Sequence, residues 1–321
     1  MKIDFIPQNF TPAEEGLLFG FSTESEEPLD VEIEIVEGDD DTVVGIQKLY
    51  QVKEGVVNIA PYVTRFNNRK PCVGKGAVRG LEALESMCYK IRIGEVESES
   101  IRVSPLRRKV HPVEAVTSMP ERREIALGEC DEVVLSVEPN MEVEADISCN
   151  KESLLYTMVS NDGLVRFLFS PDEFGASSAK VDVVLTANGN IVKELEYRVQ
   201  PRRKRSLRLA WISEAGAIER YTFPMAYSQS SRATKRRIEG CEGVEVVALS
   251  AEESVKVVSY HEPRTTIEAL SEIVSSPAVW VEVEGELRKV DILTSEVEYS
   301  KLGQLDRITL EVRLKREVVV L

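Results

Sequence analysis

The stretch RTTIEALSEIVSSPAVWVEVEGELRKVD, Arg264–Asp291, decides the fold that we expect for the last third of the chain. Thr265 followed by Glu268 has the spacing of a capping box, in which the hydroxyl accepts the N3 amide proton and the carboxylate accepts the N-cap amide proton. Pro277 ends this pattern, because the residue before a proline is biased away from the α region. The sequence therefore predicts a helix over residues 265–276.

This helix has one apolar face and precedes a strand. Ile267, Leu270 and Val274 recur at the spacing of a single helical face. Val279–Glu284 then alternates apolar and acidic residues, as a half-buried strand does. The rest of the chain has the patterns of strands, so we expect one amphipathic helix to pack against sheets in a mainly β protein.

The bulk composition indicates an ordinary globular protein of more than one domain. The chain has 321 residues, 43% of them hydrophobic and 30% charged, and two or three domains suit that length. No apolar run is long enough to span a membrane, and the N-terminus lacks the apolar core of a signal peptide. The net charge of −15 argues against a protein that wraps a nucleic-acid backbone.

Three units follow from the turn and linker signals, with boundaries at 105 and 200. Residues 1–105 are expected to form an immunoglobulin-like β-sandwich, because short strands recur without intervening helices. Arg65–Gly80 is polar and is expected to be a long loop. The strands predicted here, after one that starts at the first residue, are Leu17–Phe21, Val31–Val36, Thr42–Tyr50, Gly55–Val63, Tyr89–Ile93 and Ser100–Val103.

The linker PLRRKVHP, Pro105–Pro112, leads to a second β-sandwich over residues 106–200. Asn188 and Gly189 supply the two positive-φ residues of a type I′ hairpin, and Asp162-Gly163 marks another turn. The remaining strands predicted in this unit are Arg123–Ala126, Val133–Val137, Val143–Ser148, Leu154–Val159 and Val165–Phe169.

The segment PRRKRSLRL, Pro201–Leu209, begins the third unit, residues 201–321, which contains the predicted helix. The C-terminal REVVVL is apolar to its end, so we expect it to be held in a sheet or an interface. The strands predicted here are Leu207–Ile212, Ile218–Phe223, Val244–Leu249, Ser254–Tyr260, Val279–Glu284, Leu287–Leu293, Val297–Tyr299 and Arg307–Lys315.

No catalytic or metal-binding constellation is evident. His111 and His261 have no Cys or second His at metal-ligand spacing, so each is expected to be exposed or satisfied, and we expect no enzyme activity and no cofactor. The five cysteines form no CxxC pair and are expected to be reduced, a Cys130–Cys149 disulfide being the alternative. The Glu37–Asp41 loop is a solvated hairpin tip or, as the alternative, a calcium site. Gly74–Gly76 lacks the rest of a phosphate-loop motif.

Three basic clusters are notable in an acidic chain, at Arg107–Lys109, Arg202–Arg205 and Lys235–Arg237. They lack the interleaved aromatic residues of a nucleic-acid site. We expect them to contact acidic neighbouring subunits, where complementary charge sets the register, in preference to being solvated linkers. The candidate interface residues are Arg202, Arg203, Lys204, Arg205, Lys235, Arg236 and Arg237.

The third unit resembles the fold of bacteriophage tail tube and distal-tail (baseplate) proteins and related phage-like injection machines. The residues that carry the resemblance are LRLAWISEAGAIERYTF (Leu207–Phe223), TTIEALSEIVSS (Thr265–Ser276), and the strands AVWVEVEGELRKVDI and LDRITLEVRL. The resemblance implies a small β-sandwich or split barrel with one helix. The two units ahead of it exceed a minimal tube protein and fit a distal-tail, baseplate or decorated tube subunit.

The resemblance also implies partners. Copies of the chain would form a ring, a hexamer in that family, together with other tail proteins in a virion assembled in the host cytoplasm. Such rings close by head-to-tail contacts. If strands of the third unit line a channel, Glu282, Glu284, Glu296 and Glu298 would face passing DNA without binding it. The alternative function is a non-viral β-sandwich binding module, an adhesin or a carbohydrate-binding protein.

Overall fold

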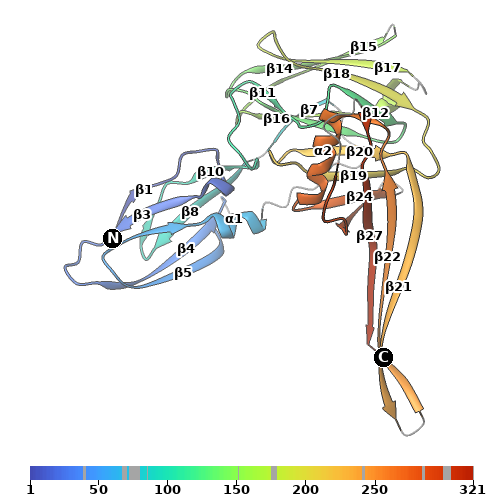
Figure 1. Cartoon of the computed structure of the whole chain (residues 1–321). Coiled ribbons are helices and arrows are strands. Elements are labelled where there is room, and N and C mark those ends of the chain that lie inside the picture. Colours follow the sequence, from blue (N-terminus) through green and yellow to red (C-terminus); the bar gives the residue numbers. More distant parts are fainter. Residues whose placement is uncertain are drawn as a thin grey trace.

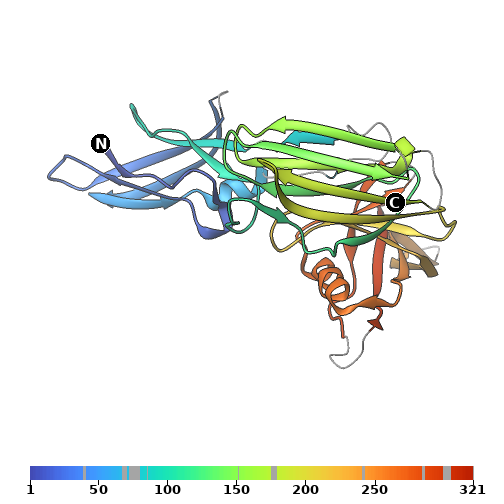
Figure 2. The same cartoon turned by 90° about the horizontal axis from the view of Figure 1, so that it is seen from above.

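The computed structural model shows a mainly β protein made of three packed units (Figures 1 and 2). In Figure 2 the first unit (blue) extends from one end of the second (green to yellow), and the third (orange to red) lies against the second. Among the described residues, no helix is long and apolar enough to cross a membrane. The structure describes residues 1–38, 41–66, 71, 80–84, 86–150, 152–174, 179–240, 243–283, 286–298 and 305–320.

The first unit consists of two sheets around one apolar core. The smaller sheet has the order β1 (Lys2–Phe5), β3 (Leu18–Ser22), β6 (Glu54–Asn58). Phe19, Ile33 and Ile91, from both sheets, are fully buried between them. The larger sheet has the order β2 (Thr11–Pro12), β10 (Ile101–Ser104), β8 (Met87–Ile93), β4 (Leu29–Glu37), β5 (Thr42–Val52), and β9 (Val96–Glu97) pairs with β8.

The strand predicted over Gly55–Val63 was wrong in its second half. The strand β6 ends at Asn58, and a short helix α1 (Ala60–Phe66) follows, next to the 3-10 turn η1 (Ala13–Glu15). The Asn58 side-chain oxygen accepts hydrogen bonds from the Ala60 and Leu17 amides, each at 3.0 Å. Pro61 then falls in the first turn of the helix, where a missing N–H costs nothing. The sequence pattern around Pro61 predicts the end of a strand, but a proline is equally compatible with the start of a helix.

The second unit is a two-layer, immunoglobulin-like β-sandwich, as predicted. One sheet has the order β11 (Glu114–Val116), β13 (Asp131–Ser136), β16 (Leu164–Phe169), β7 (Gly80–Ala83), and the 3-10 turn η2 (Pro171–Phe174) follows β16. The other has the order β12 (Arg122–Ala126), β18 (Asn190–Gln200), β17 (Lys180–Ala187), β14 (Glu142–Cys149), β15 (Glu152–Val159).

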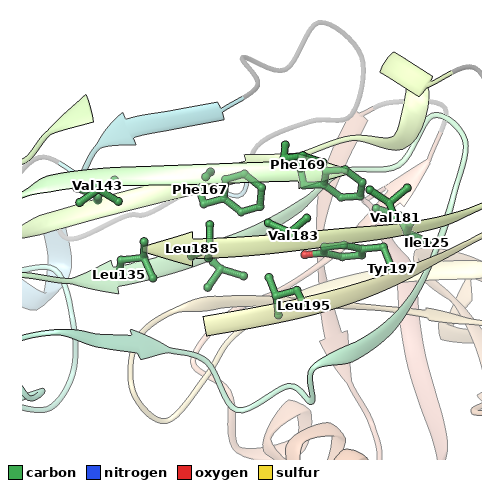
Figure 3. Packing of buried hydrophobic residues seen from close by; sticks show 14 of the residues in the cluster. Ile125, Leu135, Val143, Phe167, Phe169, Val181, Val183, Leu185, Leu195 and Tyr197 are labelled. Carbon is green, nitrogen blue, oxygen red and sulfur yellow. The ribbon is translucent and has the colours of Figure 1, made fainter. Parts of the chain in front are cut away.

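The core of this sandwich lies between the inward faces of its two sheets (Figure 3). Phe167 and Phe169 from β16 face Leu185 and Tyr197 from the opposite sheet, and the Phe169 and Tyr197 ring centroids are 4.3 Å apart. The hairpin that joins β17 to β18 confirms the predicted turn chemistry. Asn188 and Gly189 have φ of 47° and 76°, both positive, as a type I′ turn requires.

Strand β7 belongs to the sheet of the second unit although it precedes the first unit's β8 in the chain. Its residues pair antiparallel with β16, from Val165↔Ala83 to Leu168↔Gly80. No strand was predicted there, because a four-residue strand next to a polar, glycine-rich segment has no readable period. Gly80 has φ of 100°, and a Cβ on it would lie 2.6 Å from the Tyr156 ring.

The third unit is built on one seven-stranded sheet that carries the helix α2 (Arg264–Ser275). Ile267, Leu270 and Ile273 are fully buried between the helix and the sheet, together with Trp211 of β19. A short pair, β23 (Glu262–Pro263) and β26 (Leu305–Asp306), flanks the helix. The sheet order is β20 (Ile218–Phe223), β19 (Leu207–Ile212), β24 (Val279–Val283), β25 (Glu286–Ile292), β27 (Thr309–Val320), β22 (Gly243–Val258), β21 (Met225–Gly240).

The predicted helix is present, but the predicted capping box was wrong. The N-cap of α2 is Pro263, no side chain caps it, and Glu268 accepts instead from the Arg264 guanidinium Nε at 2.7 Å. Pro263 is held extended by its pairing with Leu305, so the helix starts before Thr265 reaches the capping position. The helix ends at Ser275, ahead of Pro277, as predicted.

Two strand predictions of the third unit also differ from the structure. Val297–Tyr299 was wrong for its described part, because residues 293–298 form no strand. Strand β25 pairs with β27 only at Asp291 and Ile292, and the chain then leaves the sheet. Val244–Leu249 and Ser254–Tyr260, predicted as two strands, are parts of the continuous strand β22.

Candidate functional site

A long three-stranded projection, here called the arm, extends from the third unit (Figure 1). Strands β21 and β22 pair along their whole length, from Met225↔Val258 to Gly240↔Gly243. Strand β27 pairs on the other side of β22 as far as Ala248↔Val320. The arm comprises Ser228–Gly240, Gly243–Glu253 and Arg313–Val320. Thirteen residues of strand correspond to a length of about 40 Å.

Strand β21 of the arm has no core beneath it over its described residues. Every residue of β21 from Tyr227 to Glu239 is exposed, which means that neither face of this strand is covered. A sheet in a folded domain normally buries at least one face. The base of the arm is different, because Val255, Val257 and Leu310 belong to the core of the third unit. The polar interruption Ser250–Glu253 misled the strand prediction because period-two patterns presuppose one buried face.

The middle of the arm carries a ladder of alternating charge across its three strands. Arg232 of β21 lies opposite Glu252 of β22, which lies opposite Arg316 of β27. At the base, the Ser230 and Ser254 hydroxyl oxygens are 2.7 Å apart, and Ser254 donates to Glu311 at 2.8 Å. The Arg313 guanidinium lies 3.6 Å from Glu252, and an ion pair that is this exposed contributes about 0–1 kcal/mol. Cross-strand pairing thus supports the arm without hydrophobic burial.

The distal half of the arm combines a basic strand with apolar sequence. Lys235, Arg236 and Arg237 lie on β21 opposite Leu249, Ala248 and Val246 of β22. Ile238 is 48% exposed and Val244 is 63% exposed, so apolar surface is in contact with solvent beside these cations. Among the described strands, β21 pairs with β22 alone, which leaves its outer edge available for another strand.

The second predicted interface cluster lies at the other end of the arm. Arg202, Arg203, Lys204 and Arg205 are exposed and precede β19. The Arg205 carbonyl accepts from the Ala226 amide at 2.8 Å, which places this segment beside the start of β21, and the Arg203 guanidinium lies 5.0 Å from the Tyr260 ring. The structure therefore does not bring the two clusters together. The linker cations Arg107 and Lys109 pair within the chain, with Glu14 and Glu15.

Of the four acidic residues considered as channel-lining, the three that the structure describes do not share a strand face. Glu282 of β24 is only 9% exposed, and its carboxylate lies 3.9 Å from the Arg208 guanidinium. Glu296 and Glu298 are exposed but lie outside any strand. Glu284 and the centre of the Glu37–Asp41 loop, residues 39 and 40, are outside the described residues, as is Gly74–Gly76.

A buried ionic network that the sequence analysis missed joins the second and third units, and is here called the joint. From the third unit, Arg208 donates to Glu129 at 3.2 Å and to the Cys130 carbonyl at 2.7 Å, and Arg220 lies 3.3 Å from Glu132. All of these residues are at least nine-tenths buried. Burying a charge requires close partners, so such a network fixes one geometry between the two units.

Arg123 completes the joint from the second unit. Its guanidinium lies 2.8 Å from Asp131 and 4.0 Å from Glu219 of β20, and the Tyr197 hydroxyl donates to Asp131 at 2.9 Å. Burial alone would raise the pKa of Asp131, but Arg123 and Arg208 outweigh it, so this pKa lies below its usual value. Burial dominates at Glu219 and raises its pKa to about 7, although Arg123 opposes the shift.

The Cys130 thiol, which lies in the joint, is expected to have low reactivity. Burial raises the pKa of the Cys130 thiol to about 11, so it stays protonated and is a poor nucleophile. Cys130 and Cys149 are both buried and neither is in a disulfide, so the alternative of a disulfide between them was wrong. Among the described residues, no group of three or more His, Cys, Asp or Glu side chains is placed to hold a metal ion.

Two cavities lie beside these elements. One of about 640 Å³ opens on the joint and is lined by Arg123, Asp131, Arg208, Tyr221, Glu262 and Thr266. Its wall carries both signs of charge. The other, of about 530 Å³, lies between the end of α2 and strands β24, β25 and β27, with a mostly aliphatic wall that includes Ile273, Val279 and Leu314. In the first wall, the Tyr221 hydroxyl donates to Glu262 at 2.8 Å.

Comparisons with known proteins add little. No family model matches the chain, and no curated protein matches it. Among solved structures, the chain is similar to the crystal structure of chicken CNTN1 FN1–FN3 domains, with 9% sequence identity and a TM-score of 0.23 over 79% of this chain and 91% of that chain. A likeness this low supports no argument about function.

Proposed function

We propose that this protein is a structural subunit of a phage tail, a distal-tail, baseplate or decorated tube component, that acts by joining copies of itself and other tail proteins. The observation that carries the proposal is the arm, whose strand β21 is exposed on both faces from Tyr227 to Glu239. A projection of this kind, with apolar sequence at its end, is stabilised when it is covered by another subunit.

Two further features support an assembly role. The joint holds the third unit, from which the arm extends, against the second unit through buried charge pairs. The arm therefore has a fixed orientation relative to the second unit. The unpaired edge of β21 offers main-chain hydrogen bonds to a neighbour, the mode by which sheets extend between subunits. Neither feature implies conversion of a substrate.

The test is to measure assembly of the full chain and of a variant with a shortened arm. The variant joins Arg232 to Glu252 through Asn-Gly and ends at Arg316, since these three residues are cross-strand neighbours. We expect the full chain to form rings or tubes in negative-stain micrographs and large particles in mass photometry. We expect the variant to remain monomeric with an unchanged melting temperature.

The outcome against the proposal is a full chain that stays monomeric at every concentration, also when other tail components are present. A glycan array on the same sample tests the alternative, a β-sandwich binding module. Specific glycan binding that survives shortening of the arm would favour that alternative, because the arm would then have no part in the activity.

A further inference from the structure

The charge of the chain is divided unevenly between its units. Residues 1–105 hold 11 basic and 19 acidic residues, and residues 106–200 hold 10 basic and 17 acidic. Residues 201–321 hold 19 of each. The entire net charge of −15 thus comes from the first two units, while the arm's strand β21 has four basic residues and one acidic residue. A cationic strand on the third unit and acidic surfaces on the other units favour head-to-tail contact between copies.

A second sheet edge lies on the acidic second unit. Among the described strands, β15 is the last of its sheet and pairs with β14 alone, with β7 of the opposite sheet close to it. Leu155 is 63% exposed and Val159 is 53% exposed, so this edge, like the distal arm, combines strand geometry with apolar surface. Its eight residues equal the length of Arg232–Glu239 on the arm.

Acidic residues lie beside that edge. Glu142, Glu144 and Asp146 alternate along β14 and therefore share the face that is directed away from the sandwich core. They stand opposite Val159, Thr157 and Leu155 of β15. Glu142 and Asp146 are exposed, and Glu144 accepts from the Thr186 hydroxyl at 3.2 Å. The cations Arg232, Lys235, Arg236 and Arg237 on β21 are exposed as well.

We propose that the outer edge of β21 in one copy adds to the β15 edge of a second copy, with Lys235 and Arg237, which share one face of β21, directed at Glu142, Glu144 and Asp146. This rests on the proposed assembly function and names its partner surface. The contact is heterologous, because the arm of one copy uses a different surface of the next. Each copy keeps a free arm or a free edge until the ring closes.

A charge-exchange experiment tests this contact. The arm-reversed variant carries Lys235→Glu, Arg236→Glu and Arg237→Glu, and the edge-reversed variant carries Glu142→Lys, Glu144→Lys and Asp146→Lys. We expect each variant alone to need at least a tenfold higher concentration for half-assembly in mass photometry. Mixing the two in equal amounts should restore assembly, because each arm then meets an edge of opposite charge. A chain with all six changes should also assemble.

The control is reversal of three exposed acids on the first unit, Glu24→Lys, Glu26→Lys and Glu27→Lys, which changes net charge by the same amount. An effect of this control equal to that of the edge-reversed variant would overturn the inference, as would a mixture that assembles no better than either variant alone. A wild-type chain that never assembles overturns the proposed function itself, so the two failures are distinguishable.

Discussion

At the scale of single residues, the joint buries several charged side chains, which costs free energy unless each charge has a close partner. Arg208 and Glu129 are 5% and 3% exposed, so each depends on the other for the solvation that water no longer gives. The sequence contained a faint signal. Strands β13, β19 and β20 are buried on both faces yet include charged residues, which a single sandwich core does not require. These charged residues can be interpreted as an ionic network only when the strands that pack against them are known.

We expect Arg208→Ala to destabilise the protein by about 3–5 kcal/mol, because it leaves Glu129 buried beside an empty volume. Urea unfolding followed by tryptophan fluorescence measures this. Arg288→Ala is the matched control, since its ion pair with Glu286 is 61% and 70% exposed, and its cost should stay within about 0.5 kcal/mol. Equal costs for the two variants would show that the joint contributes no more than a surface pair.

The raised pKa of Glu219 gives a pH prediction. Because the folded-state pKa is about 7 and the unfolded pKa is near the ordinary value of 4.5, the native state binds more protons between these two pH values. Stability is therefore full below about pH 4.5, falls as the pH rises from there to about 7, and then levels off, for a total loss of at most about 3 kcal/mol. Glu219→Gln stays neutral, so we expect its free energy of unfolding, relative to wild type, to increase from pH 5 to pH 8.

Burial also raises the pKa of Glu262, Glu272 and Glu282, which titrate in the same direction in both proteins. Their contributions cancel in the difference between the variant and wild type. Asp131, whose pKa is lowered, loses its stabilising effect only in more acidic solution. Unfolding curves for the two proteins that stay parallel from pH 5 to pH 8 would refute the role given to Glu219.

At the scale of elements, strands with one buried face were predicted well and the other elements were not. The hairpin Leu207–Ile212 and Ile218–Phe223 was predicted with its observed bounds, because alternation and a turn define it locally. The arm, β7 and α1 were missed or divided. The arm lacks a buried face, β7 is defined by its distant partner β16, and α1 depends on the Asn58 side chain. Each of these needs tertiary information.

The turn at Gly216 packs directly against the backbone of the linker. Gly216 has φ of 90°, and a Cβ there would lie 2.6 Å from the Arg107 amide nitrogen and 2.9 Å from the Leu106 Cα. Leu106 is 1% exposed and packs with Val134 and Ala217, so the linker is tied to the second and third units. The segment predicted as a linker thus contributes a fully buried side chain.

We expect Gly216→Ala to cost about 1–3 kcal/mol and to speed proteolytic cleavage of the 105–112 linker, since strain and a backbone clash combine there. Gly189→Ala is the control, because φ is also positive, at 76°, but nothing lies within 4 Å of the added Cβ. Thermal melting and timed trypsin digestion measure both effects. Equal cleavage rates for the two variants would mean that the contact with the linker contributes nothing.

At the scale of the whole molecule, association by opposite charges makes assembly dependent on salt. The arm cations and the acids of β14 lie on surfaces where ions screen them, with a Debye length of about 10 Å at 0.1 M and about 3 Å at 1 M. We expect the concentration for half-assembly to rise about tenfold between 0.05 M and 0.5 M sodium chloride. The shortened-arm variant should show no such dependence. An assembly that strengthens with salt would indicate a contact dominated by apolar burial.

Strand β7 has a consequence for how the polypeptide reaches this shape on the ribosome. Its partner β16 is synthesised about 80 residues later, as Ala83 pairs with Val165. When the first unit leaves the ribosome, β7 has no partner strand until β16 is synthesised, although domains generally fold in order of synthesis. Truncation of the chain at residue 105 therefore removes a strand from the sandwich of the second unit. The first two units must consequently fold together.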